Sequence, residues 1–222
     1  MLSRHRSCNR VDFDSSGHES GTSWVSRQKP NETRMSRIRT RISLPADAFQ
    51  DPTSPRSPNM PIFALEIKAN LVGVTDLRPE DYEDFRWYLK LKCTNCGEIN
   101  DNWVYADVTE AQELSKGHGV GHIVGKCKLC SRQNSLEILT DSYKSYSIEK
   151  NEKFQPLVKF ECRGVEPVDF DFRVGWRAEG PESGTVFNDI DLAEKEWAEY
   201  DEKAAESTEI NELSCRFTHC KK

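Results

Sequence analysis

The segments Cys93-Thr94-Asn95-Cys96 and Cys127-Lys128-Leu129-Cys130 decide how this sequence is interpreted. Each is a C-x-x-C motif, and 30 residues lie between the two motifs. A two-residue spacer lets one tight turn direct two sulfurs to a common point, and two such turns supply the four thiolates of a tetrahedral zinc site. Gly97 follows the first motif, where such a turn often requires a positive φ. We therefore predict one Zn²⁺ ion bound by Cys93, Cys96, Cys127 and Cys130.

The residues around the motifs agree with a metal site, although two other chemistries stay open. Lys92, Lys126 and Lys128 flank the cysteines and would offset the net negative charge of a zinc tetrathiolate. Another thiophilic metal could use the same donors, and a reactive C-x-x-C could serve redox chemistry. Redox enzymes of the thioredoxin type place one such motif at the start of a helix, whereas both motifs here follow strand-like runs. Four thiolates also leave no open position for water on the metal, so we expect a structural ion and no enzymatic activity.

Length and composition are those of a globular chain. The 222 residues are 36% hydrophobic and 31% charged, enough for one large domain or two small ones. No apolar run approaches the 18 residues of a membrane-spanning helix, so no membrane association is expected. The first residues lack the apolar region of a secretory signal, which indicates a reducing compartment where paired cysteines bind metal more readily than they form disulfides. We expect a cytoplasmic protein that could also enter the nucleus.

The chain divides at Met60 into two unlike parts. Residues 1–59 are rich in Ser, Arg and Pro, show no sustained apolar period, and carry 10 basic against 6 acidic residues. They predict a disordered basic extension. Within it, the stretch Arg34–Arg41 is a basic segment that would suit targeting or nucleic-acid binding, or would simply be solvated. Residues 60–222 form the patterned, zinc-binding β domain and retain 21 basic and 31 acidic residues, a net charge of −10.

Period-two alternation of apolar residues in the patterned part predicts an all-β fold. One short helical turn is expected at 109–115, and residues 193–206 favour a strand over a helix. A closing strand with one bulge is expected around Ile210–Phe217. Each C-x-x-C lies at the bend of a predicted hairpin, in the position of a zinc knuckle. The predicted strands cover residues 61–72, 85–92, 103–105, 122–126, 134–140, 157–162 and 170–176.

The two halves of the patterned part show a similar alternation of apolar and polar residues. The run Leu157–Cys162 resembles Leu89–Cys93, which suggests an internal repeat with halves 60–140 and 141–222. The expected fold is therefore two similar antiparallel β-sandwich-like halves, with the zinc-knuckle hairpins in the first half and a disordered N-terminal tail.

An ordered series of motifs resembles the eukaryotic family of CXXC motif-containing zinc-binding proteins over about residues 60–220. The resemblance implies a small all-β zinc protein of the cytosol, with one ion held by Cys93, Cys96, Cys127 and Cys130, and it implies no established catalytic activity. The motifs are Leu77-Arg78-Pro79, Asp84–Lys90, Cys93–Glu98, Lys126–Cys130, Phe160–Phe170, Trp197–Lys203 and Glu206-Ser207.

Further cysteines and histidines raise the question of other sites. His118 and His122 lie in a glycine-containing loop and are interpreted as exposed loop residues, with a ligand role as the alternative. Cys215, His219 and Cys220 could form a second metal site, although alternation places Cys215 towards the core. Cys162 occupies the strand position that corresponds to Cys93 but lacks a second cysteine three residues later, so it predicts a buried thiol that binds no metal. Cys8 lies in the extension.

These observations favour a non-enzymatic zinc-binding protein, a monomer that serves as an interaction or metal-handling module. An interaction module would take a protein partner in addition to the zinc ion. One alternative is thiol-based metal transfer or redox activity through the C-x-x-C pairs. The other is a nucleic-acid-binding zinc protein, which the net charge of −10 disfavours because phosphates would be repelled. The sequence contains no G-x-S-x-G, Walker or dinucleotide-binding motif.

Overall fold

A computed structural model describes residues 60–114 and 119–220. This part of the chain is mostly β, with several antiparallel sheets that include a half-barrel, and it contains no α-helix. The predicted all-β class is therefore confirmed. No helix of the described residues is long and apolar enough to cross a membrane. The prediction of a disordered extension at 1–59 concerns residues outside the described ranges.

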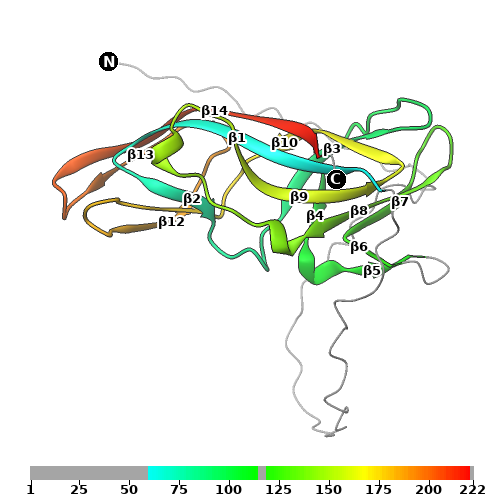
Figure 1. Cartoon of the computed structure of the whole chain (residues 1–222), viewed down its shortest axis with the longest axis horizontal. Helices are drawn as coiled ribbons and strands as arrows, with labels where there is room; N and C mark the ends of the chain where they lie inside the picture. The colour runs from blue at the N-terminus through cyan, green and yellow to red at the C-terminus, as the bar shows by residue number, and fades with distance from the viewer. Residues whose placement is uncertain (1–59, 115–118, 221–222) are drawn as a thin grey trace, which may run out of the picture.

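A long sheet runs the length of the molecule (Figure 1). Its strands lie in the order β13-β14-β1-β9-β8-β7, and every neighbouring pair is antiparallel. The first described strand therefore pairs with the last, so that Ile62 lies opposite Cys220. The bounds are β1 (Ile62–Val72), β7 (Ile123–Lys126), β8 (Gln133–Leu139), β9 (Gln155–Arg163), β13 (Trp197–Asp201) and β14 (Glu206–Cys220).

Three smaller sheets complete the fold. One has the order β10-β3-β4, from β3 (Trp87–Cys93), β4 (Val104–Ala106) and β10 (Val165–Asp171). Another has the order β12-β11-β2, from β2 (Thr75–Pro79), β11 (Trp176–Glu179) and β12 (Val186–Ile190). The short strands β5 (Gln112–Glu113) and β6 (Val120–Gly121) pair with each other. Single 3₁₀ turns occur at η1 (Val108–Glu110), η2 (Thr140–Ser142) and η3 (Ile148–Lys150).

The sheets enclose one aromatic core. Along β3, Trp87, Leu89, Leu91 and Cys93 are buried in alternation with half-buried residues, as the period of two predicts. Trp176 is fully buried, and its Nε1 donates a hydrogen bond of 2.7 Å to Phe172 O. The other buried aromatic residues of this core are Phe85, Tyr146, Phe160, Phe170, Phe172 and Phe187.

The expected bulge in the closing strand is confirmed. The β1–β14 register shifts between Lys68 and Asn70, where β14 contributes additional residues. A bulge leaves backbone groups of the ladder unpaired. At this bulge the Tyr146 hydroxyl pairs with both backbone groups of Ala69: it accepts a hydrogen bond from Ala69 N at 3.1 Å and donates one to Ala69 O at 2.8 Å. Residues 197–201 form a strand, as favoured over a helix.

The prediction of two β-sandwich-like halves is wrong, because strands of the first half pair with strands of the second. β1, from the first half, pairs with β9 and β14 from the second, and β3 pairs with β10. Residues 60–140 and 141–222 therefore share their sheets instead of forming one sandwich each. The similarity between Leu157–Cys162 and Leu89–Cys93 reflects two core strands with the same alternation, and alternation alone carries no information about which strand is the partner.

Candidate metal centre

The first C-x-x-C motif forms a tight turn at the end of β3, and its first cysteine is one of the buried residues of that strand. Cys93 is the last residue of β3, and the chain turns back so that Cys93 N donates to Glu98 O at 2.7 Å and Gly97 N donates to Cys93 O at 2.9 Å. Gly97 has φ +81°, as expected from its place after the motif. The strand that follows the turn is β4, which pairs with β3, so the motif lies at the bend of a hairpin.

The second C-x-x-C repeats this geometry. Cys127 N donates to Arg132 O at 2.9 Å, and Ser131 N donates to Cys127 O at 2.9 Å. Ser131 takes the place of Gly97 and has φ +58°, a backbone conformation that a residue with a Cβ rarely adopts. The turn joins β7 to β8, which pair as a hairpin. Both predicted knuckles are therefore present.

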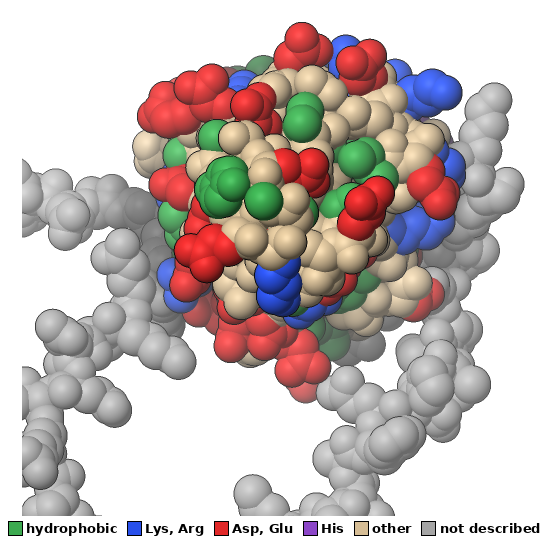
Figure 2. Space-filling view, turned by 90° about the vertical axis from the view of Figure 1, so that its left-hand side faces the viewer, with side chains coloured by type: hydrophobic (Ala, Val, Ile, Leu, Met, Phe, Trp, Pro, Cys, Tyr) green, Lys and Arg blue, Asp and Glu red, His purple; other side chains and the backbone are tan. Residues whose placement is uncertain are grey.

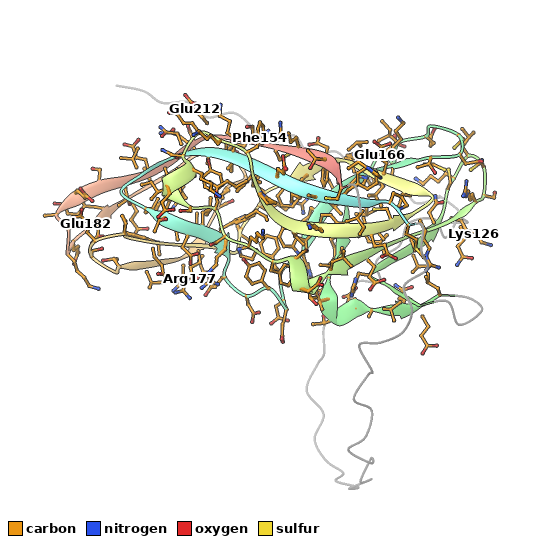
Figure 3. The ribbon with its side chains drawn as sticks, in the orientation of Figure 1. Lys126, Phe154, Glu166, Arg177, Glu182 and Glu212 are labelled. Carbon is orange, nitrogen blue, oxygen red and sulfur yellow. The ribbon has the colours of Figure 1, made fainter. Side chains whose placement is uncertain are left out.

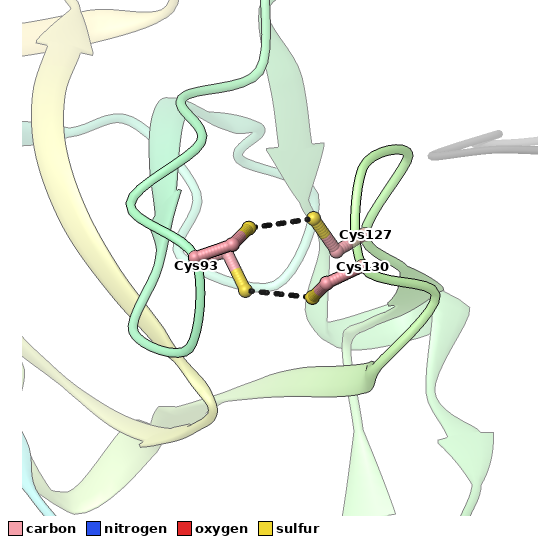
Figure 4. A group of neighbouring side chains, drawn as sticks. Cys93, Cys127 and Cys130 are labelled. Carbon is pink, nitrogen blue, oxygen red and sulfur yellow. Dashed lines mark hydrogen bonds between the residues drawn. The ribbon is translucent and has the colours of Figure 1, made fainter.

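The two turns bring the four predicted ligands together. The sulfurs of Cys93, Cys96, Cys127 and Cys130 all lie within 4.8 Å of one another. Two contacts join the turns: the Cys93 and Cys130 sulfurs are 3.7 Å apart, and the Cys96 and Cys127 sulfurs are 3.5 Å apart (Figure 4). Four sulfurs about 2.3 Å from one tetrahedral ion would be separated by about 3.8 Å, whereas a disulfide needs about 2.05 Å. The donor set and its spacing therefore fit a single zinc ion.

The protonation of the thiols supports the same conclusion. Burial raises the pKa of Cys93, but hydrogen bonds from the backbone N–H groups of Cys96 and Asn95 outweigh it and lower that pKa to about 6. The pKa of Cys130 is also lowered, chiefly by the backbone N–H of Arg132. At Cys96, the backbone N–H of Glu98 lowers the pKa, but burial and the neighbouring sulfurs raise it to about 12. The raised pKa of Cys96 beside the lowered pKa values of Cys93 and Cys130 reflects the repulsion between like charges at this spacing, which a bound cation would offset.

The four cysteines differ in exposure. Cys93 and Cys127 are buried, with 2% and 3% of their surface exposed, while Cys96 and Cys130 are half-buried. Each turn thus places its first sulfur against the core and its second nearer to solvent. Lys126, one of the lysines that flank the cysteines in the sequence, marks this end of the molecule in Figure 3.

Two residues that the sequence analysis did not assign to the site hold the first turn in place. Gly164 O accepts a hydrogen bond of 3.0 Å from Thr94 N. The buried Asn134 amide nitrogen donates to Gly164 O and to Gln133 O, each at 3.1 Å, because an oxygen in that position would face two acceptors. Gly164 has φ +71°, and a Cβ there would lie 2.3 Å from the Asn134 amide. The only signal for Gly164 in the sequence was its place between two predicted strands. Its contact with a turn 70 residues earlier could not be predicted from the sequence.

The other candidate ligands do not join the cluster. His118 lies outside the described residues. His122 is half-buried instead of exposed: its Nδ1 accepts a hydrogen bond of 2.9 Å from Ile138 N, and burial lowers its pKa. Among residues 60–114 and 119–220, no further group of three His, Cys, Asp or Glu side chains is close enough to bind a metal.

The C-terminal cysteines are spread along β14. Cys215 lies opposite Ile67, while His219 and Cys220 lie opposite Phe63 and Ile62. Cys215 packs against the core, as alternation predicted, and the hypothesis of a second metal site is wrong for these residues. Cys162 is fully buried, as predicted, and burial raises the pKa of its thiol.

The fold and the cluster together define a mostly-β protein with a four-cysteine centre suited to one metal ion. Comparison with known proteins then gives the family: residues 64–218 match the model of the eukaryotic CXXC motif containing zinc binding protein, and the chain belongs to this family. The resemblance noted in the sequence is therefore confirmed.

Relatives align with the patterned part of the chain. The protein named CXXC motif containing zinc binding protein from Bos taurus is 56% identical over 156 residues, covering 70% of this chain and 97% of the bovine protein. A UPF0587 protein of Caenorhabditis elegans is 52% identical over 159 residues, covering 72% and 95% of the two chains. The crystal structure of C1orf123 matches with a TM-score of 0.69 and 53% identity over 72% of this chain and 99% of that chain.

Proposed function

We propose that this protein is a non-enzymatic zinc-binding protein with one structural ion held by Cys93, Cys96, Cys127 and Cys130. The observation that carries the proposal is that two separate turns place all four sulfurs within 4.8 Å of one another. Four thiolates complete a tetrahedral shell, which leaves no position where a water could be activated. The ion would supply a cross-link between the two turns.

The place of that cross-link in the fold supports a structural role. Cys93 ends β3 in the sheet β10-β3-β4, while Cys127 follows β7 at the edge of the long sheet. One ion would therefore join two sheets at the end of the molecule. We infer a monomeric interaction or metal-handling module of the cytoplasm, also compatible with the nucleus. Nucleic-acid binding has less support, because the patterned part carries a net charge of −10.

Metal analysis tests this proposal directly. Protein purified without added metal should contain one zinc per chain, and Cys93→Ser or Cys127→Ser should lower that content at least tenfold, because each removes one of four thiolate donors. Cys220→Ser is the matched control, since Cys220 is a half-buried thiol outside the cluster, and it should keep the full metal content. Metal-free wild-type protein, or disulfides among the four cysteines, would refute the proposal.

Metal transfer is the second candidate, because Cys96 and Cys130 are half-buried. For a structural site we expect all four cysteines to resist iodoacetamide in native buffer, since metal-bound thiolates are held and shielded, while Cys220 reacts. Mass spectrometry after timed labelling measures both. Rapid labelling of Cys96 and Cys130, with loss of zinc to a competing chelator on the same timescale, would instead favour exchange through the outer pair of sulfurs.

A further inference from the structure

The two turns that carry the cysteines meet at one corner of the fold. β9 belongs to the long sheet and ends at Arg163, β10 belongs to the sheet β10-β3-β4 and begins at Val165, and Gly164 is the single residue between them. Gly164 has φ +71°, the left-handed conformation that favours glycine. A glycine between strands marks a sharp bend or a close approach of another backbone. The chain therefore passes from one sheet to the other at Gly164.

The first turn is attached to this corner through β10. Cys93 lies opposite Val165, so the pairing of β3 with β10 leads directly into the turn. The next residue, Thr94, donates its backbone N–H to Gly164 O at 3.0 Å. A shift of the corner would therefore move the turn that holds Cys93 and Cys96.

The second turn is attached to the same corner through β8. This strand follows the turn and pairs with β9, with Ser135 opposite Arg163. The preceding residue, Asn134, is 1% exposed, and its amide nitrogen donates to Gly164 O at 3.1 Å. Gly164 O therefore accepts one hydrogen bond from the first turn, through Thr94, and one from the strand that leaves the second.

The Asn134 amide also touches a metal ligand. Its oxygen lies 3.7 Å from Cys93 Sγ, so one buried side chain joins the corner to the first sulfur. Gly164 leaves the room for this side chain, because a Cβ at Gly164 would overlap the amide. We propose that Asn134 and Gly164 are positioning residues of the metal centre, whose contact fixes the two turns relative to each other and thereby sets the affinity for zinc.

This inference rests on the proposed zinc site and adds what tunes it. Four thiolates repel one another, so the turns tend to separate when no cation is bound. A contact that holds the turns in place without the metal leaves less reorganisation for the ion to drive, and this preorganisation raises affinity. Residues that support metal ligands from outside the ligand shell commonly change affinity by about 10- to 100-fold.

Competition of the full chain with a chelator of known zinc affinity, below the melting temperature of every variant, tests the proposal. Asn134→Ala should weaken zinc binding by about 10- to 100-fold, while saturated protein still holds one zinc per chain. Gly164→Ala should cause a similar loss, because its methyl group displaces the amide. The absorption bands of Co²⁺ bound at the site should shift in both variants. Asn134→Ala adds no atoms, so it carries the test alone if Gly164→Ala does not fold.

A matched control lies at the opposite end of the molecule. A Cβ at Gly180 would overlap Ser183 Oγ and lie 2.7 Å from the carboxylate of Asp201, which is 1% exposed. Glu182, in the same turn, marks this end in Figure 3, far from Lys126, and Figure 2 shows it with acidic side chains around a group of apolar ones. Gly180→Ala should therefore disturb a buried polar contact and lower the melting temperature, yet leave zinc affinity and the Co²⁺ bands unchanged.

A double variant shows whether the two residues act through one contact. Once Asn134→Ala has removed the amide, adding Gly164→Ala should weaken zinc binding no further. Three results would overturn the proposal: wild-type affinity or wild-type Co²⁺ bands in Asn134→Ala, an equal loss in the Gly180→Ala control, or losses that multiply in the double variant. Each of these would leave the zinc site itself in place, whereas a wild-type protein that binds no zinc would refute the site.

Discussion

Removing the metal is expected to lower the melting temperature of the purified protein by about 10 °C or more. A ligand at 1,000 times its Kd stabilises the folded state by about 4 kcal/mol, and for a chain of this size each kcal/mol corresponds to roughly 2–4 °C. The loss follows from the position of the site, because the two turns belong to different sheets and the four sulfurs would repel one another as thiolates. Thermal unfolding with and without a strong chelator, alongside metal analysis of the same samples, measures the change.

Chelation should first loosen the structure around the two turns, before the whole protein unfolds. Amides of the two turns, at 93–99 and 127–132, should exchange faster after chelation, while the pairing of β1 with β14 should stay protected until overall unfolding. Re-addition of zinc should restore the melting temperature, and Cys93→Ser should be insensitive to the chelator. A stripped protein that melts at the same temperature as the loaded one would show that the ion does not stabilise the fold.

Replacing Trp176 by alanine is expected to cost about 3–5 kcal/mol of unfolding free energy, the usual range for truncating a buried aromatic residue. Trp176 is fully buried, and its ring lies 5.1 Å from Phe85 and 5.8 Å from Phe172, measured between centroids. Truncation would leave a cavity at the junction of the sheets and would leave Phe172 O without the hydrogen bond from the indole. Denaturant unfolding measures the free energy.

Two variants make this measurement specific. Trp103→Ala removes a half-buried indole that stands under Lys90 at 5.2 Å, and it should cost about 1 kcal/mol or less, as expected for a surface contact. Trp176→Phe should recover part of the loss. Zinc content should be the same in all three, because none of them touches a ligand. A Trp176→Ala protein as stable as the wild type would mean that the aromatic core is not the main source of stability.

The sequence was sufficient for features that depend on local spacing. Cys93 and Cys96 lie in one turn because two residues separate them, and the positive φ that this turn requires after Cys96 is met by a glycine, Gly97. The alternation along β3 predicted which side chains enter the core, since a strand repeats every two residues. The buried state of Cys162 followed from the same rule.

The remaining features depend on which strands meet, and no local pattern encodes that. β3 pairs with β10 and β1 with β14, across about 80 and 150 positions of sequence, so the supposed halves share their sheets. For the same reason, the support that Asn134 and Gly164 give to the first turn was not predicted. His122 was expected to be exposed because it lies in a loop, yet it is half-buried and its Nδ1 accepts a hydrogen bond from Ile138 N.

The pairing of β1 with β14 has a consequence for biosynthesis. A ribosome synthesises β1 before any other described strand, but its neighbour β14 is completed only with Cys220, about 150 residues later. The nascent chain therefore keeps β1 without this partner until the other described strands have been synthesised. All four cysteines have been synthesised by residue 130, so metal capture can precede completion of the sheet and hold the two turns together while β9 and β14 are still being made.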